Sequence, residues 1–157
     1  MCITVTKNVK LNDSRFDFDK ITLLPENYYE SEDKYRYSST AISFWKYSNN
    51  KIDINILTEP KLLIEKRSGE WFGPDILLIS TLVAQNPAIV SILCGIISNY
   101  LTDFFKGMSK PKVKLKIFYK EEKSSKTTEI SYEGDIKGIN KLEASILKIV
   151  NQGKNFE

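Results

Sequence analysis

Two pairs of carboxylates have the residue types and spacing that could support chemistry. Glu70 and Asp75 lie beside two aromatic residues, and an aromatic pocket can raise the pKa of a carboxyl group. Asp17 and Asp19 alternate with phenylalanines, so a strand would direct both carboxylates to one face, where they could hold Mg²⁺ or Ca²⁺. Simpler interpretations are favoured for both pairs, because acidic residues also stabilise helix N-termini and occupy solvated strand faces.

The sequence lacks histidine, the Cys and His ligands of a zinc site, and the common nucleophile and phosphate-binding motifs. The chain has no histidine, which is the most common general base and metal ligand near neutral pH. Its two cysteines, Cys2 and Cys94, cannot supply the four Cys or His ligands of a structural zinc site. There is also no GxSxG motif and no P-loop. We therefore expect no catalytic residues, no metal site and no cofactor, and so a protein that is not an enzyme.

Composition is that of an ordinary soluble protein. The length of 157 residues suits one domain with a single core, so we expect one α+β domain over residues 1–157. The net charge of +3 is mild, and its charged residues are interspersed, which makes nucleic acid an unlikely partner. The N-terminus lacks the pattern of a signal peptide. A disulfide between Cys2 and Cys94 is possible, but a reduced cytoplasmic setting fits better.

The segment from residue 69 to residue 107 is the most apolar in the chain, and its middle contains no charged side chain. Pro74 and Pro87 each stand where a helix can begin, because proline at the first helical position loses no useful hydrogen-bond donor. We predict two helices, at about 74–85 and 87–106, that pair as an apolar helical hairpin at the centre of the fold.

The second predicted helix has a large-residue face and a small-residue face. The small residues recur at steps of four and three and would let another helix approach closely. The first predicted helix is the natural partner, although a second subunit could also pack there. The candidates for self-association are therefore Ser91, Gly95, Ser98 and Thr102.

A membrane segment is the alternative interpretation of this apolar stretch. One continuous span would be long enough to cross a bilayer. However, Gln85, Asn86 and Pro87 would then lie at its middle, where polar groups and a freed carbonyl are costly. We favour the buried hairpin, and we keep as the alternative a membrane-associated subunit that inserts residues 75–101.

Strand patterns flank the apolar stretch. Alternating apolar and polar residues predict strands at 3–11, 113–119 and 128–132, and the last two would form a hairpin. The segment AISFWKY-SNN-KIDINIL, residues 41–57, predicts another β-hairpin with an Asn-Asn turn. Residues 26–40 lack a clear period and are interpreted as a long surface loop.

The C-terminal part of the chain predicts an amphipathic helix that Asp135 could cap. Its apolar positions recur at three- and four-residue steps: Ile139, Leu142, Ile146 and Ile149. We therefore predict an antiparallel sheet packed on the central helical hairpin and on this last helix. Lysines on the strand at 113–119 could bind phosphate groups or an anionic membrane surface, but a solvated outer face is the favoured explanation. These are Lys112, Lys114, Lys116 and Lys120.

A tyrosine-rich segment is the best candidate for a binding surface. Tyr, Trp and Arg concentrate binding energy at protein interfaces. Aromatic side chains could also stack on single-stranded nucleic acid, but Glu30, Glu32 and Asp33 would repel phosphates. We therefore expect a protein partner. The candidate contact residues are Tyr28, Tyr29, Tyr35, Arg36, Tyr37, Trp45 and Tyr47.

The second half of the chain shows a family resemblance. From about Ile89 to Val150 the predicted order is an apolar helix, the strand VKLKIFYK, the strand TTEISYEG and an amphipathic helix. This order resembles the small non-catalytic, effector-associated accessory domains of bacterial conflict and defence systems. The resemblance implies an adaptor or partner-binding role within a larger complex, and it transfers no site residues.

Overall fold

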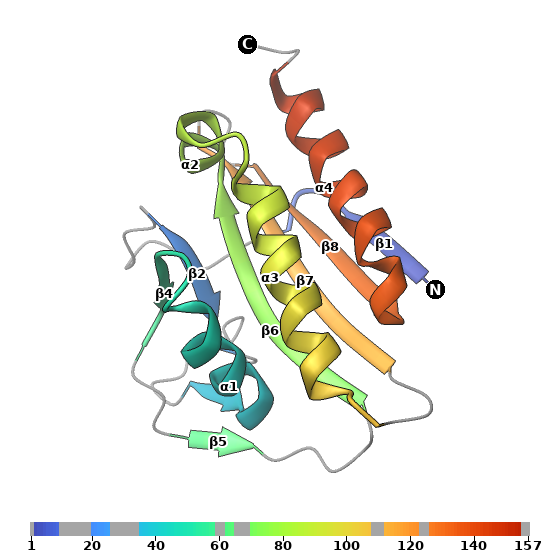
Figure 1. Cartoon of the computed structure of the whole chain (residues 1–157). Coiled ribbons are helices and arrows are strands. Elements are labelled where there is room, and N and C mark those ends of the chain that lie inside the picture. The colour runs from blue at the N-terminus through green and yellow to red at the C-terminus, as the bar shows by residue number, and fades with distance from the viewer. Residues whose placement is uncertain are drawn as a thin grey trace.

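The protein folds as a mixed six-stranded sheet with its main helices on one face (Figure 1). The computed structural model describes residues 2–9, 20–25, 35–58, 62–64, 70–107, 112–122 and 126–154. In spatial order, the strands of the sheet are β1 (Cys2–Thr6), β8 (Lys126–Gly134), β7 (Lys112–Glu121), β6 (Glu70–Ile79), β2 (Ile21–Leu24) and β4 (Ile54–Ile56). A second, parallel pair consists of β3 (Arg36–Ser38) and β5 (Leu62–Ile64).

The helices cover one face of the six-stranded sheet. They are α1 (Ser39–Ser48), α2 (Ser80–Gln85), α3 (Ile89–Phe104), the short 3-10 helix η1 (Ile136–Gly138) and α4 (Ile139–Lys154). Figure 1 shows α3 crossing β6 and β7, with α4 on one side of it and α1 on the other. The predicted α+β class is confirmed.

Within the six-stranded sheet, three of the five strand pairings are antiparallel, as predicted, but two are parallel. The parallel pairs are β6 with β7 and β2 with β4. The first follows from the connection, because the chain leaves β6, crosses the sheet through α2 and α3, and returns in β7. A strand that is reached through a helical crossover runs parallel to the strand before it.

The predicted helical hairpin over residues 74–106 is wrong in its first half. Residues 70–79 form β6, and only the six residues of α2 are helical before Asn86. Ile76, Leu77 and Leu78 are each fully buried, because β6 lies between β7 and β2 and is covered on both faces. A continuous apolar run is typical of such a central strand.

Pro74 marks an irregularity in β6 rather than the start of a helix. The register of β6 against β7 shifts between Phe72 and Asp75. A bulge leaves a residue without a ladder hydrogen bond, so the missing N–H of proline is tolerated there. The second predicted helix, in contrast, is confirmed as α3, and Gly107 turns the chain after it with a φ of 86°.

The predicted hairpin over residues 41–57 is also wrong in its first strand. Residues 39–48 form α1, which begins where the Ser38 side chain accepts a hydrogen bond from the Ala41 amide at 3.1 Å. The second predicted strand is present as β4, but it pairs in parallel with β2. Part of the predicted loop over 26–40 is ordered as β3 and the start of α1, and residues 26–34 lie outside the described residues.

The core lies between the helices and the sheet. Alternate residues of β7, such as Leu115 and Ile117, point into it together with Leu93 of α3 and Ile146 of α4. The face of the sheet that points away from the helices, here called the far face, carries a smaller buried cluster of Leu24, Leu77 and Phe118.

The alternative hypothesis is that residues 75–101 insert into a membrane. In the structure these residues form the end of β6, α2 and most of α3. Residues 75–79 belong to β6, and α3 packs on the sheet through its large apolar side chains. Across the described ranges, none of the helices combines the length and the apolar character that a bilayer crossing requires.

Candidate functional site

The predicted tyrosine-rich surface does not form one continuous surface. Tyr28 and Tyr29 lie outside the described residues. Tyr37 is only 1% exposed, so it belongs to the core and not to a contact surface. Its hydroxyl oxygen accepts a hydrogen bond from the Thr58 amide at 3.1 Å and lies 3.3 Å from the Thr58 carbonyl. Burial raises the pKa of Tyr37 above its ordinary value.

The remaining tyrosine-rich candidates divide between the two faces of the sheet. Tyr35 is half-buried against the far-face cluster, and Arg36 is exposed. Trp45 lies on α1, where its indole Nε1 donates a hydrogen bond to the Ile54 carbonyl at 3.1 Å and ties the helix to β4. Trp45 and Tyr47 both belong to α1, on the helix side of the sheet.

Tyr47 belongs to an aromatic cluster between α1 and α3. Its ring centroid lies 5.3 Å from that of Tyr100, which also packs edge-on against Phe44 at 5.4 Å and stacks on Phe104 at 5.9 Å. Offset and edge-on ring pairs of this kind are mutually attractive. Tyr47 and Phe104 are half-buried, so the cluster reaches the surface. We call Phe44, Tyr47, Tyr100, Phe104 and Phe105 the aromatic cluster.

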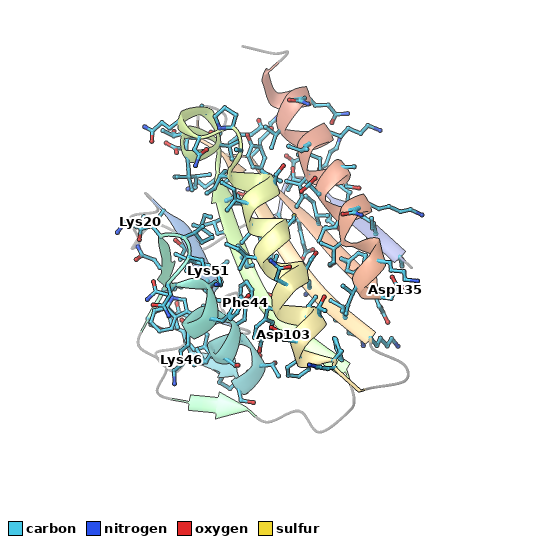
Figure 2. All side chains as sticks on the ribbon, in the orientation of Figure 1. Lys20, Phe44, Lys46, Lys51, Asp103 and Asp135 are labelled. Carbon is cyan, nitrogen blue, oxygen red and sulfur yellow. The ribbon has the colours of Figure 1, made fainter. Side chains whose placement is uncertain are left out.

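Two polar contacts hold the aromatic cluster in place. The Tyr100 hydroxyl donates a hydrogen bond to Ser43 Oγ at 2.9 Å. Lys51 places Nζ 4.8 Å from the centre of the Tyr47 ring, where a cation is attracted to the ring face. In Figure 2 the labels of Phe44, Lys46, Lys51 and Asp103 lie around α1 and the lower part of α3. The sequence places Tyr100 and Phe104 on the large-residue face of the second predicted helix, but it does not show that α1 lies beside them.

The small residues of α3 point outward. Ser91, Gly95 and Thr102 are exposed and Ser98 is half-buried. The predicted partner helix is not there, because α2 packs at the ends of β6 and β7 instead. A Cβ atom added to Gly95 would meet no heavy atom within 4 Å. The small-residue stripe is therefore open to an approaching surface.

We call the exposed side of this helix the outer face of α3. It consists of Ser91, Ile92, Gly95, Ser98, Asn99 and Thr102. Ile92 is 41% exposed, and it is one of two large hydrophobic side chains that stand out as exposed in the described part of the chain; the other is Val5. From Ile89 to Thr102 the helix has no charged residue. In contrast, α4 exposes Lys141 and Lys148 on its solvent side.

The lysines of β7 lie on the far face of the sheet, opposite acidic residues of β8. Lys112 is 3.3 Å from Glu133, and Lys116 is 3.7 Å from Glu129. These partly exposed ion pairs contribute little to stability. They do, however, place acidic groups among the lysines, so this face has a mixed charge rather than a basic one.

The candidate catalytic and metal-binding residues are the last group that the sequence singled out. The residues that the structure describes contain no group of three or more His, Cys, Asp or Glu that could hold a metal ion. Asp17 and Asp19 lie outside the described residues, and Asp75 is half-buried in β6. Cys2 is exposed and Cys94 is buried, and both are free. Burial raises the pKa of the Cys94 thiol to about 12, with Glu143 adding to the effect, which makes this thiol a poor nucleophile.

Comparison of the chain with family models, with curated proteins and with solved structures finds no match.

Proposed function

We propose that this protein is a non-enzymatic interaction module that acts within a larger complex and binds a protein partner on the outer face of α3. The observation that carries the proposal is the composition of that face. An exposed helix face normally carries charged residues, but the outer face of α3 offers Ser91, Gly95 and Thr102 beside the exposed Ile92. Depletion of charge is typical of the centre of protein interfaces.

The shape of this face favours a helix as the partner element. The distance between packed helices depends on the side chains at their contact, and small side chains permit the closest approach. Gly95 leaves open space at the middle of the face. A partner helix could therefore pack against α3 and cover Ile92, as amphipathic helices do when they bind a hydrophobic surface.

The aromatic cluster would extend the contact at one end of α3. Tyr47 on α1 and Phe104 in the last turn of α3 are half-buried. Partly exposed tyrosines contribute strongly to interfaces because they present large, rigid surfaces that also form hydrogen bonds. Lys46, Lys51 and Asp103 surround the cluster with charges, which corresponds to the polar rim of an interface around an uncharged centre.

The setting of the complex follows from weaker observations. Both Cys2 and Cys94 are free thiols, which supports a reducing, cytoplasmic compartment. The resemblance of residues 89–150 to accessory domains of bacterial conflict systems stays a prediction, because no match tests it.

The test compares partner capture by three forms of the tagged protein expressed in cells of its source organism: wild type, Gly95→Arg and Ala144→Arg. A Cβ atom at position 95 would meet no heavy atom within 4 Å, the position is exposed, and arginine is a better helix former than glycine, so the fold should persist. Ala144 is exposed on α4 and provides the matched control. We expect capture to be lost in Gly95→Arg and kept in Ala144→Arg. Equal capture by all three forms would refute the proposal.

A further inference from the structure

The outer edge of β1 is a second surface that the described residues leave open. Strand β1 pairs with β8 on one side and is the last strand of the sheet, and Figure 1 shows it at the sheet's outer edge. In the described part of the chain, no strand pairs with its other side. Such an edge presents backbone N–H and C=O groups that can pair with another strand.

Natural proteins protect edges of this kind with charges, prolines, bulges or short strands. None of these lies within β1, because its five residues are Cys2, Ile3, Thr4, Val5 and Thr6 and its pairing with β8 is continuous. The exposed Lys7 and Asn8, with a φ of 60°, follow the strand. The other edge strand, β4, has only three residues and follows Asp53, which pairs with Lys20 at 3.3 Å. Among the described residues, the β4 edge therefore has protection that β1 itself lacks.

We propose that β1 pairs antiparallel with β1 of a second copy of this chain, about a two-fold axis at Thr4. This register places Thr4 opposite Thr4 of the other copy, Ile3 opposite Val5, and Cys2 opposite Thr6. It is the register in which all five strand residues find a partner within the other β1. The two six-stranded sheets would join into one continuous sheet.

The side chains of β1 match one another in this register. Ile3 and Val5 lie beside Tyr132 and Ile130 of β8, which belong to the core on the helix side. Opposed residues of antiparallel strands share a face, so Ile3 of one copy would cover Val5 of the other. Val5 is 43% exposed in the single chain, and this pairing would bury it.

The far-face side of β1 is also self-complementary. Cys2, Thr4 and Thr6 lie there, opposite the far-face residues of β8, and all three are exposed. They are small and uncharged, so no like charges would face each other across the two-fold axis. Opposed threonines stabilise a strand pair. A partner with a different sequence would have no such matching built into this chain, so a second copy is the occupant that β1 itself specifies.

Light scattering coupled to size exclusion over a series of protein concentrations tests the proposal. The wild type is expected to approach the mass of a dimer as concentration rises. Thr4→Lys and Thr4→Glu should each raise the dissociation constant at least about tenfold, because like charges would then face each other at the two-fold axis. An equimolar mixture of these two variants should form dimers again. Asn55→Lys, at the centre of the other edge strand, is the matched control and should leave the dimer intact.

A cross-link tests the register. In a Cys2→Ser background, Thr4→Cys should form a disulfide between two chains on mild oxidation, because directly opposed residues have Cα atoms about 4.5–5.5 Å apart, within disulfide range. Thr6→Cys in the same background should form no such disulfide, because residue 6 of one copy would lie about 13 Å along the strand from residue 6 of the other. A wild type that stays monomeric throughout would overturn the proposal. A dimer that Thr4→Lys leaves intact would also overturn it. The same holds for an equimolar mixture of Thr4→Lys and Thr4→Glu that stays monomeric, and for a dimer that only Gly95→Arg disrupts.

The two proposals fail independently. Loss of partner capture in Gly95→Arg concerns the outer face of α3 and leaves the mass of the dimer unchanged. Loss of the dimer in Thr4→Lys concerns the edge of β1 and does not decide whether a partner binds α3.

Discussion

The hydroxyl of Tyr100 donates a hydrogen bond to Ser43 Oγ at 2.9 Å and thereby joins α3 to α1 across 57 residues of sequence. The ring of the same tyrosine contacts Phe44, Tyr47 and Phe104. Tyr100 is thus the residue through which the two helices share one aromatic cluster, at the end of the surface proposed to bind a partner.

We predict that Tyr100→Phe lowers the free energy of unfolding by about 0.5–1.5 kcal/mol, because one hydrogen bond is lost while the ring contacts remain. Ser43→Ala should cost no more, and the double variant should cost about as much as Tyr100→Phe alone. Urea denaturation of the three variants measures these differences. Fully additive losses would show that the two side chains do not act as a pair.

Tyr37→Phe is expected to be more costly than Tyr100→Phe. The Tyr37 hydroxyl accepts a hydrogen bond from the Thr58 amide and also lies 3.1 Å from Thr58 Oγ1. Removal of this oxygen leaves polar groups of Thr58 without their partner near a buried ring, at a cost of about 1–3 kcal/mol. Thermal or urea unfolding measures the change, and a loss below about 0.5 kcal/mol would contradict the role of Tyr37 as a buried anchor.

The two thiols should differ in reactivity. Cys2 is exposed and Cys94 is buried, and only the thiolate reacts with disulfide reagents. We predict that Ellman's reagent modifies one thiol rapidly in the native protein and both thiols in denaturant. Cys2→Ser should abolish the rapid reaction, whereas rapid modification that persists in this variant would place Cys94 at the surface.

Alkaline pH should destabilise the protein, partly through Cys94. Its pKa rises from 9.0 in the unfolded chain to about 12 in the fold because the thiol is buried. Above pH 9 the unfolded chain therefore binds fewer protons than the native one, and stability falls with pH, with a limiting slope of about 1.4 kcal/mol per pH unit. The contribution of the neutral thiol is fully present below pH 9 and is lost as pH rises toward 12.

Urea denaturation at a series of pH values measures this dependence. Between pH 9 and pH 10, the free energy of unfolding of Cys94→Ala should change less steeply than that of the wild type. Tyr37 and Tyr132 also have pKa values raised above 10.0 by burial, so a further loss above pH 10 should remain in the variant. Identical slopes in the two proteins would contradict the burial of the thiol.

Two glycines of the α3 region should respond in opposite directions to alanine. Gly95 has open space around it, so Gly95→Ala should stabilise the chain by about 0.5–1 kcal/mol, because alanine is the better helix former. Gly107 has a φ of 86°, and Gly107→Ala should destabilise by about 1–2 kcal/mol, since a Cβ strains this conformation. Urea midpoints of the two variants test both signs, and a destabilising Gly95→Ala would show that the site is not open.

Several elements could be predicted from the sequence because their patterns are complete within one segment. The alternation from Val113 to Tyr119 and the stripe from Ile139 to Ile149 needed no knowledge of neighbouring elements. The expected cap at Asp135 is also present, since its carboxylate accepts a hydrogen bond from the Gly138 amide at 3.0 Å. Local periodicity decides such elements.

β6 and α1 could not be predicted in the same way. Residues 76–79 are apolar on both sides of the chain, so they show neither the helical period of about 3.6 residues nor the strand period of about 2 residues. Only the neighbours β2 and β7 reveal a central strand. Pro74 fits the start of a helix as well as a bulge. In α1 the short run from Ala41 to Trp45 fits either period, and the cap at Ser38 decides for the helix.

The candidate surface was only partly predictable for the same physical reason. The small-residue stripe of α3 follows from spacing alone, but its exposure depends on where α2 lies. The burial of Tyr37 depends on Thr58, which is 21 residues away. Likewise, the partnership of Tyr47 with Tyr100 depends on the packing of α1 beside α3.

The most direct test of the proposed function is photo-cross-linking from the outer face of α3. Benzoylphenylalanine would replace Ile92 in one form of the protein and Ala144, exposed on α4, in a matched control. In cells of the source organism, we predict one prominent adduct with a partner protein from position 92 and none from position 144. Three results would contradict a partner-binding face on α3. Position 92 could give no adduct, it could give only adducts between two copies of the chain, or it could give the same adducts as position 144.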